Sequence, residues 1–121
     1  MKNKRKHFLV TGGTGFIGSS ICQMLIKNGH QVTIFDNNSR GSLKKILSIR
    51  GRVKFIKGDI KNYKKLNKAT SKVDSIIHLA YVNGTKYFYT KPTLVLDIAV
   101  KGIINIFEVC KKNKIKELYL A

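Results

Sequence analysis

A glycine-rich stretch near the start of the chain constrains its fold more than any other feature. The stretch, KHFLVTGGTGFIG over Lys6–Gly18, is a short apolar run that breaks into glycines and then resumes as a helical pattern. Phe8–Val10 is typical of a buried strand, and Thr11–Gly15 of a turn that only small residues can make so tightly. From Phe16 onward apolar residues recur at helical spacing until Asn28–Gly29 supplies a stop. The sequence therefore predicts a strand, a glycine turn and a helix in direct succession.

A turn of this kind is suited to binding a phosphate or pyrophosphate. It directs backbone N–H groups, and the positive end of the helix dipole, at the space above Gly15. In this interpretation Gly12 allows the turn to form, Gly15 admits the ligand and Gly18 lets the helix approach the strand. The alternative is a tight turn before a core helix that binds nothing. The flanking strand and helix are the context that a dinucleotide-binding motif requires, so they favour the first interpretation.

An acidic residue at the end of the next strand agrees with a dinucleotide ligand. Gln31–Phe35 has the pattern of a strand and ends in Asp36, close to the interval of about 20 residues expected after the last glycine. A carboxylate there accepts hydrogen bonds from the adenosine ribose hydroxyls and repels a 2′-phosphate. The sequence therefore favours NAD over NADP. Arg40 lies nearby and favours a phosphate, which leaves NADP as the alternative.

The formal net charge of +18 is distributed along the chain rather than concentrated in one segment. Most of the positive residues are lysines, with no aromatic-interleaved stripe and no recognised nucleic-acid motif, so we do not expect specific nucleic-acid binding. Binding to DNA or RNA remains an alternative, and it would show as an affinity that falls steeply with salt. The positive potential would also help attract an anionic dinucleotide or a nucleotide-linked substrate.

The length of 121 residues allows one domain without a linker. No apolar run approaches the roughly 18 residues needed to span a bilayer, and the first run is too short for a signal-peptide core. We therefore expect a cytoplasmic protein with no membrane partner. Cys22 and Cys110 each lie in a helical pattern without a second cysteine nearby, so buried reduced thiols are expected rather than a disulfide or a metal site.

The rest of the chain alternates strands with helices. A short helix capped by Ser42 is expected to end at Gly51, and a weaker helix is centred on Tyr63–Ala69. Tyr81–Lys91 is expected to be a loop. Pro92 then opens a long helix with apolar residues on more than one face, which suits packing against two neighbours or a subunit interface. With further strands at 52–57, 74–80 and 115–121, this alternation predicts an α/β fold with a doubly wound parallel sheet in the strand order 3-2-1-4-5.

Five motifs occur in order along the chain: TGGTGFIG, Asp36 with DNNSRG, GDI at Gly58–Ile60, HLA at His78–Ala80 and the final KGIINIFEVCKKNKIKELYLA. Together they resemble the extended short-chain dehydrogenase/reductases, and within them the NAD-dependent epimerase/dehydratase family that acts on nucleotide sugars. The resemblance covers the whole chain. It implies a Rossmann fold, NAD as the cofactor, a nucleotide-sugar substrate and a homodimer when the protein is complete. The reaction would be an epimerisation, dehydration or decarboxylation with transient hydride transfer to NAD.

The resemblance also implies which residues surround the cofactor. The pyrophosphate would be lined by Gly12, Gly15, Phe16, Ile17 and Gly18. Around the adenosine ribose would lie Asp36, Asn37, Ser39 and Arg40. The adenine edge would meet Asp59 and Ile60. Beneath the nicotinamide ribose would pass Leu79, Ala80 and Tyr81.

Two departures from the family pattern bear on activity. Ala99 stands where the family usually has an asparagine, three residues before the glycine matched by Gly102, so a polar contact near the cofactor is in question. The serine-rich stretch after the fifth strand, and the Tyr-x-x-x-Lys pair beyond it, are not within these residues. We therefore expect residues 1–121 to be an NAD-binding domain truncated at the fifth strand, without a substrate domain and inactive alone. A non-catalytic dinucleotide-binding protein of the same fold is the alternative.

Some singled-out residues also have plainer explanations. Tyr87 and Lys91 match the Tyr-x-x-x-Lys spacing. However, Pro92 disfavours a helical conformation at the residue before it, so we expect loop residues rather than a catalytic pair. Asp59 is also a candidate cap for the following helix. His78 is expected to be a satisfied core residue, because no carboxylate partner is evident in the sequence.

Overall fold

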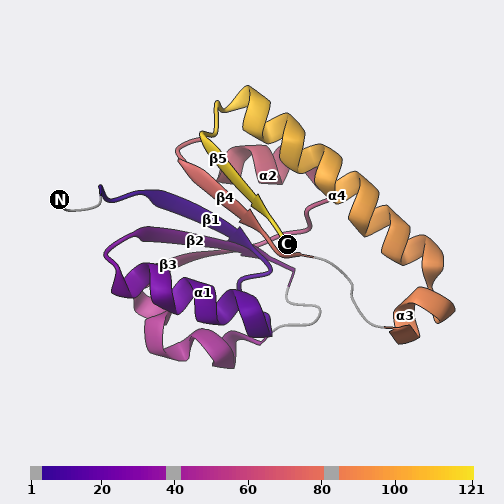
Figure 1. The fold of residues 1–121 in the computed structure, drawn as a ribbon, viewed down its shortest axis with the longest axis horizontal. Coiled ribbons are helices and arrows are strands. Elements are labelled where there is room, and N and C mark those ends of the chain that lie inside the picture. The colour runs from indigo at the N-terminus through magenta and orange to yellow at the C-terminus, as the bar shows by residue number, and fades with distance from the viewer. Residues whose placement is uncertain (1–3, 38–41, 81–84) are drawn as a thin grey trace.

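The computed structural model describes residues 4–37, 42–80 and 85–121, which form a five-stranded parallel sheet with helices on both faces (Figure 1). The strands are β1 (His7–Thr11), β2 (Gln31–Asp36), β3 (Val53–Lys57), β4 (Ser75–His78) and β5 (Glu117–Leu120). The helices are α1 (Phe16–Lys27), the 3-10 helix η1 (Leu43–Arg52), α2 (Tyr63–Ala69), α3 (Thr85–Thr90) and α4 (Pro92–Lys112). The sheet order is β3-β2-β1-β4-β5, so the predicted doubly wound α/β fold and its strand order are confirmed.

Every strand pair in the sheet is parallel, which places the carboxyl ends of all strands at one edge. β1 lies at the centre, where Leu9 pairs with Thr33 of β2 and with Ile76 of β4. The chain proceeds outward from β1 to β3 on one side and then crosses to β4 on the other. Doubly wound sheets bind ligands at the carboxyl edge beside such a reversal. The ends of β1, β2 and β4 are therefore the place to look for a site.

Side-chain alternation divides the core between the two faces of the sheet. On β1, Phe8 and Val10 belong to a cluster with α1 and η1, whereas Leu9 belongs to a cluster with α2 and α4. Residues such as Cys22 of α1 and Ile106 of α4 complete the two clusters. Figure 1 shows α1 on one side of the sheet and α2 and α4 on the other. The sheet is thus covered on both faces, as its continuous apolar strands require.

Helix boundaries follow the local chemistry of the sequence. α1 ends at Lys27, with Asn28 at the C-cap and Gly29 in the left-handed conformation at φ +85°. The Ser42 hydroxyl accepts an N–H of the first turn of η1, as predicted, although η1 has 3-10 geometry and continues through Gly51 to Arg52. α4 begins at proline, where the missing N–H has no cost in the first turn of a helix.

The segment after β4 corrects one prediction. A loop is expected over Tyr81–Lys91, but Thr85–Thr90 forms helix α3, so the prediction is wrong for that part. Residues 81–84 lie outside the described part of the chain. Lys91 then leaves the helical conformation at φ −140° and ψ 60°, because Pro92 disfavours the α region at the residue before it. Helices α3 and α4 are therefore separate, as the proline predicts.

The last two strands are shorter than expected. β4 covers Ser75–His78 rather than residues 74–80. Beyond it, the Ala80 N–H bonds to the hydroxyl of Thr11 at 3.1 Å, so the chain turns to a side chain instead of extending the ladder. β5 begins at Glu117 rather than at residue 115. The carboxyl edge therefore begins one or two residues earlier on β4 than the apolar run suggests.

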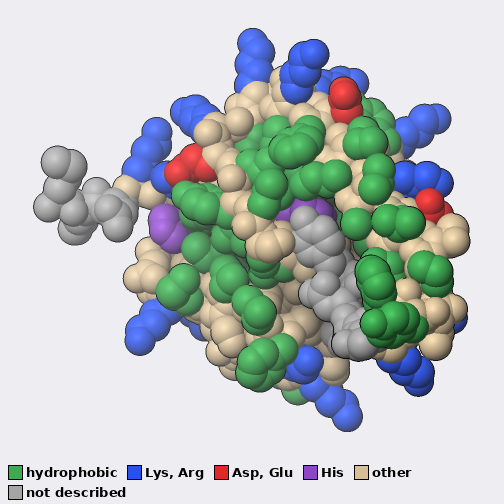
Figure 2. Space-filling model, turned by 45° about the vertical axis from the view of Figure 1, so that its right-hand side comes forward, with side chains coloured by type: hydrophobic (Ala, Val, Ile, Leu, Met, Phe, Trp, Pro, Cys, Tyr) green, Lys and Arg blue, Asp and Glu red, His purple; other side chains and the backbone are tan. Residues whose placement is uncertain are grey.

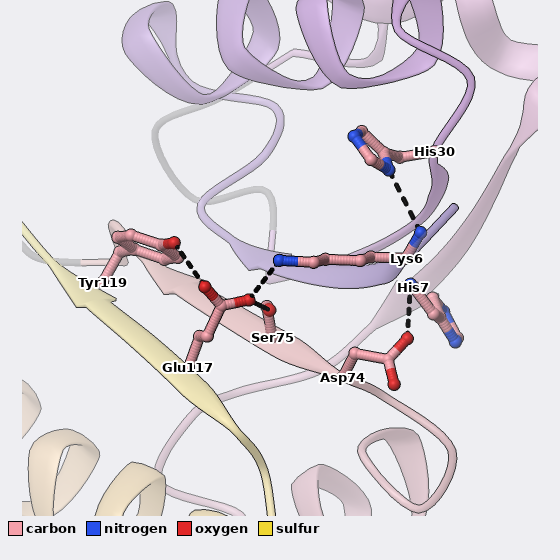
Figure 3. Close-up of polar contacts among 7 residues, drawn as sticks. All are labelled: Lys6, His7, His30, Asp74, Ser75, Glu117 and Tyr119. Atoms are coloured by element: carbon pink, nitrogen blue, oxygen red, sulfur yellow. Dashed lines mark hydrogen bonds and ion pairs between the residues drawn. The ribbon is translucent and has the colours of Figure 1, made fainter. Parts of the chain in front are cut away.

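Polar side chains join three strands at the amino end of the sheet (Figure 3). The Lys6 ammonium lies 2.8 Å from Oε1 of Glu117, which also accepts from the Ser75 hydroxyl at 2.8 Å. The Tyr119 hydroxyl donates to Oε2 of Glu117 at 2.9 Å. The hydrogen bond from Lys6, followed by those from Ser75 and Tyr119, lowers the pKa of Glu117 to about 2. This Glu117 network ties the edge strand β5 to β4 and to the residue that precedes β1.

The long helix α4 keeps an apolar stripe on its surface, made of Leu96, Val100, Ile104 and Phe107, each at least half exposed. Figure 2 shows hydrophobic side chains gathered over one face of the molecule, with lysines and arginines around its margin. The same helix packs against α2 and α3. The expectation of two neighbouring elements is therefore confirmed, and a subunit interface stays a prediction.

The two cysteines differ in burial. Cys22 is buried and Cys110 is half-buried, and both are free thiols. Burial, with a smaller contribution from the charge of Asp36, raises the pKa of the Cys22 thiol to about 12, so this thiol stays protonated. Within residues 4–37, 42–80 and 85–121, no three His, Cys, Asp or Glu residues gather as a metal site would require. None of the helices described is long and apolar enough to cross a membrane.

Candidate functional site

The glycine turn between β1 and α1 lies between the ends of β2 and β4. Gly12 has φ +74°, and a side chain there would come within 3.0 Å of the backbone carbon of Leu79. On its other side, the Gly12 N–H donates to the carbonyl of Phe35 at 3.2 Å. Both the conformation and the close approach require glycine, as the sequence predicts for this position.

Gly18 and Gly15 have different surroundings. A Cβ on Gly18 would lie 2.1 Å from the Gly12 carbonyl oxygen, so only glycine lets α1 approach the turn. A Cβ on Gly15 would meet, among the described atoms, only the Gly12 oxygen at 3.3 Å. Packing therefore explains the glycine at position 18. At position 15 no other described atom lies within 4 Å of such a Cβ, which fits the predicted approach of a ligand.

The first turn of α1 offers backbone N–H groups to a ligand. Gly15 occupies the N-cap position and has no side chain to cap them. The first intrahelical bond runs from the Ser19 N–H to the Gly15 oxygen at 2.9 Å, so the donors before it have no intrahelical acceptor. The side chains of Phe16 and Ile17 are exposed beside them. An anion placed there would meet these N–H groups and the positive end of the helix dipole.

Asp36 is held beside the turn by Thr14. Its Oδ2 accepts the Thr14 hydroxyl at 2.6 Å and the Thr14 N–H at 3.0 Å. Both residues are buried. The Thr14 carbonyl in turn accepts the Ser42 N–H at 3.0 Å. Thr14 was not among the residues predicted for the site. The pattern that could have indicated it is a hydroxyl residue between two glycines, the second of which directly precedes the helix.

Thr11 is the second hydroxyl residue that the sequence analysis missed. Its oxygen accepts the N–H groups of Leu79 and Ala80 at 3.0 and 3.1 Å, so its own proton is directed at His78 Nδ1, 2.7 Å away. Burial lowers the pKa of His78 to about 4, which leaves this imidazole neutral at pH 7. His78 therefore helps hold the end of β4, and its predicted place in the core is confirmed by its complete burial.

The GDI motif after β3 contacts Asp36 through its backbone, whereas its side chains bond or pack elsewhere. The Gly58 N–H donates to the Asp36 carbonyl at 3.1 Å. Asp59 Oδ1 accepts the Lys61 N–H at 2.9 Å, and the side chain of Ile60 is buried in the core. The cap of α2 is Asn62, so the alternative interpretation of Asp59 as that cap is wrong. Because the Ile60 side chain points inward, only its backbone is left to meet an adenine.

The carboxyl edge thus brings together most of the predicted cofactor residues. Gly12, Leu79 and Ala80 meet where β1 and β4 end, and Asn37 is exposed directly after β2. The predicted contacts of Ser39, Arg40 and Tyr81 lie outside the described residues. Ala99, the departure from the family pattern, is half-buried on α4.

Tyr87 and Lys91 lie on different elements rather than on one helical face. Tyr87 lies on α3, whereas Lys91 is in the non-helical link to α4. A backbone bond joins the two residues, from the Lys91 N–H to the Tyr87 carbonyl at 2.8 Å. Figure 1 shows α3 set off from the sheet, beyond the carboxyl ends of the strands. The expectation that the pair is not catalytic stays a prediction.

A hollow of about 670 Å³ lies at the opposite, amino end of the sheet. Its lining includes Arg5, Arg52, Lys54 and Lys72, together with Asp74. The Asp74 carboxylate accepts the His7 N–H at 2.8 Å and so takes part in the polar contacts at that end. This hollow is separated from the glycine turn by the length of the strands, so it is not part of the candidate site.

The sequence of this chain is similar to those of known proteins. The model of the NAD dependent epimerase/dehydratase family matches residues 8–121. Bifunctional protein GAL10 of Candida maltosa is 39% identical over 121 residues, covering 94% of this chain and 79% of that protein. UDP-N-acetyl-alpha-D-glucosaminuronate decarboxylase of Bacillus cytotoxicus is 32% identical over 117 residues, covering 97% of this chain and 36% of that protein.

A solved structure has the same fold. UDP-glucose 4-epimerase of Thermus thermophilus, in complex with NAD, superimposes with a TM-score of 0.85 at 28% sequence identity. The match covers 93% of this chain and 36% of that one. The chain therefore spans 79% of the first of these three proteins and 36% of each of the other two.

Proposed function

Because this chain belongs to the NAD-dependent epimerase/dehydratase family, we propose that residues 1–121 are the NAD-binding part of an enzyme that acts on a nucleotide sugar. The observation that carries the proposal is the glycine turn, followed at Gly15 by a helix without a side-chain cap, with the Asp36 carboxylate fixed beside it. The relatives are enzymes, which favours an enzyme over a non-catalytic dinucleotide-binding protein.

Each part of the cofactor would be bound by one segment of the carboxyl edge. The pyrophosphate is assigned to the turn and the start of α1, at Gly12, Gly15, Phe16, Ile17 and Gly18. The adenosine ribose is assigned to the end of β2 and the residues after it, Asp36, Asn37, Ser39 and Arg40. The adenine is assigned to the Asp59 and Ile60 backbone. The nicotinamide ribose is assigned to the residues after β4, Leu79, Ala80 and Tyr81.

The missing side chain at Gly15, which no described atom but the Gly12 oxygen approaches, and the uncapped donors of α1 fit a pyrophosphate. A side chain at Gly15 would compete for that space, and a capping side chain would compete for the N–H groups. NAD held there would supply the site with an acceptor, and after reduction a donor, of a hydride for the sugar. The residues of this chain bind and orient the dinucleotide, and the charge of Asp36 disfavours one that carries a 2′-phosphate.

We further propose that these residues do not move the substrate proton. The general acid or base of such a reaction needs a pKa near the working pH. His78 is buried with a pKa of about 4, and Tyr87 and Lys91 do not share a helix. The residue that exchanges a proton with the sugar is therefore assigned to a part of the enzyme other than the described residues.

The proposal extends to location and assembly. Two free thiols suit a reducing compartment, so we place the protein in the cytoplasm. The apolar stripe on α4 supports a homodimer, which sedimentation of the protein would test. The names of two of these relatives contain UDP-linked sugars, so a UDP-sugar is the first substrate to assay.

Calorimetric titration with NAD and NADP tests the central claim. We expect NAD to bind more tightly, and Asp36→Ala to weaken NAD by about tenfold or more, since hydrogen bonds to a charged group contribute about 1.5–3 kcal/mol. The same change should reduce the difference between NAD and NADP. Equal affinities in the native chain, or an unchanged preference in the variant, would contradict the assignment of Asp36.

A further inference from the structure

We propose that Thr14 is a positioning residue for Asp36, and that its hydroxyl group sets the preference of the site for NAD over NADP. The inference rests on the proposed function, since it concerns the same dinucleotide site. It adds a residue whose effect on the ligand is exerted through Asp36 rather than by direct contact.

The two bonds between these residues reach the same carboxylate oxygen. Thr14 Oγ1 lies 2.6 Å from Asp36 Oδ2, and the Thr14 nitrogen lies 3.0 Å from it. Hydrogen bonds to an ionised carboxylate are short and strong, and this pair is buried. Two donors on one oxygen fix both the position and the rotation of the carboxylate. Neither of these two bonds involves Oδ1 of Asp36.

Thr14 also joins the turn to the chain on the far side of the 38–41 segment. Its carbonyl accepts the Ser42 N–H at 3.0 Å, one residue before η1 begins. The donors and the acceptor of one residue therefore hold both Asp36 and Ser42. The position of the glycine turn is in this way coupled to the end of β2.

A fixed carboxylate discriminates better than a mobile one. A carboxylate that can rotate can turn away from a 2′-phosphate, or a water can enter between the two groups. Either change lowers the repulsion between the carboxylate and the phosphate. A carboxylate fixed before binding needs no ordering when the ribose arrives, which raises the affinity for NAD. Burial strengthens both effects because the local dielectric constant is low.

Replacing Thr14 by three other residues separates the effect of the hydroxyl group from the effect of the side-chain shape. Serine keeps the hydroxyl group, valine keeps the shape without it, and alanine keeps neither. We expect Thr14→Val to raise the Kd for NAD about tenfold and to lower the ratio of the NADP to the NAD dissociation constant by a similar factor. Thr14→Ser should stay within about twofold of the native chain. Thr14→Ala gives the same test should the valine variant not fold.

Thr70 provides a matched control. It is buried, and its hydroxyl donates to the Leu66 carbonyl at 3.0 Å at the end of α2, away from the glycine turn. Thr70→Val should therefore reduce thermal stability while leaving both dissociation constants unchanged. A purely structural role for Thr14 would give this same result, so the ratio of dissociation constants distinguishes the two roles.

A double-mutant cycle with Asp36→Ala completes the experiment. If Thr14 acts through Asp36, Thr14→Val has no further effect on the ratio once Asp36 is alanine. An unchanged ratio in the single variant, or the same change with and without Asp36, would overturn the inference. If the native chain prefers NAD in an Asp36-dependent way while Thr14→Val is neutral, only the role of Thr14 fails. If it binds neither dinucleotide, the proposed function fails with it.

Discussion

The two ends of the sheet are built from different kinds of contact. At the amino end, charged and hydroxyl side chains bond to one another across strands, with Glu117 at the centre. At the carboxyl end, the Thr11 hydroxyl bonds to His78 and to two backbone N–H groups. The Thr14 hydroxyl and N–H bond to Asp36. In the first arrangement both carboxylate oxygens of Glu117 have donors from the protein. The second leaves space and backbone donors beside it, so substitutions at the two ends should affect different properties.

The largest expected effect comes from Gly18→Ala, which would place a Cβ 2.1 Å from the Gly12 oxygen. Because that atom belongs to the backbone of the turn, we expect a loss of about 3 kcal/mol or more in the free energy of unfolding. Urea denaturation measures it. Gly51→Ala is the control, because nothing described lies within 4 Å of a Cβ there, and it should change stability by less than about 0.5 kcal/mol. Similar stabilities for the two variants would mean that the turn can move.

The second effect is on binding rather than on stability. Gly15→Val fills the space in which the pyrophosphate is expected, whereas the fold places only the Gly12 oxygen near it among the described atoms. We expect NAD affinity to fall by about a hundredfold or more, which corresponds to about 2.7 kcal/mol, with a smaller change in thermal stability. Calorimetry and thermal denaturation together separate the two. Retained affinity would show that the glycine turn has only a structural role.

The smallest effect belongs to the amino end and appears at low pH. The pKa of Glu117 is about 2 in the folded chain, below its ordinary value of 4.5, so the stability that its charge contributes is present above pH 4.5 and lost as the pH falls toward 2. The thermal midpoint of the native chain should therefore fall more over this range than that of Glu117→Gln. Salt should reduce the difference because the Glu117 side chain is still 35% exposed to solvent.

This last variant also sharpens the comparison between the two ends. Glu117→Gln should leave NAD affinity at pH 7 unchanged, because the Glu117 network lies at the opposite end of the strands. Parallel pH profiles for the native chain and the variant would mean that the ion pair contributes no measurable stability. A change in NAD affinity would mean that the two ends are not independent.

Features with a local cause could be predicted from the sequence. The glycine turn, the break at Pro92 and the acid at the end of β2 each follow from one residue type at one place. The strand order follows from the alternation of strands and helices together with the handedness of their connections. Helix α3 was missed because six residues, with several aromatics, are too few to establish a helical period.

Features that depend on tertiary contacts could not be predicted. The roles of Thr11 and Thr14 depend on partners 67 and 22 residues away in the chain. The inward direction of Ile60 depends on α4, where Gly102 leaves room for it. A motif match places such a residue near the site but does not say which way its side chain points.

The division of the core into two clusters affects how the chain is completed during synthesis. The buried members of the cluster beneath α1 and η1 all lie between Phe8 and Val53. The cluster on the other face requires Ile106 and Val109, although Leu9 and other members of it are made early. A chain emerging from the ribosome can therefore cover one face of its sheet while the other is still bare. The time needed to translate from Val53 to Val109 is the time for which that apolar face must be shielded, whether by the ribosome or by a chaperone.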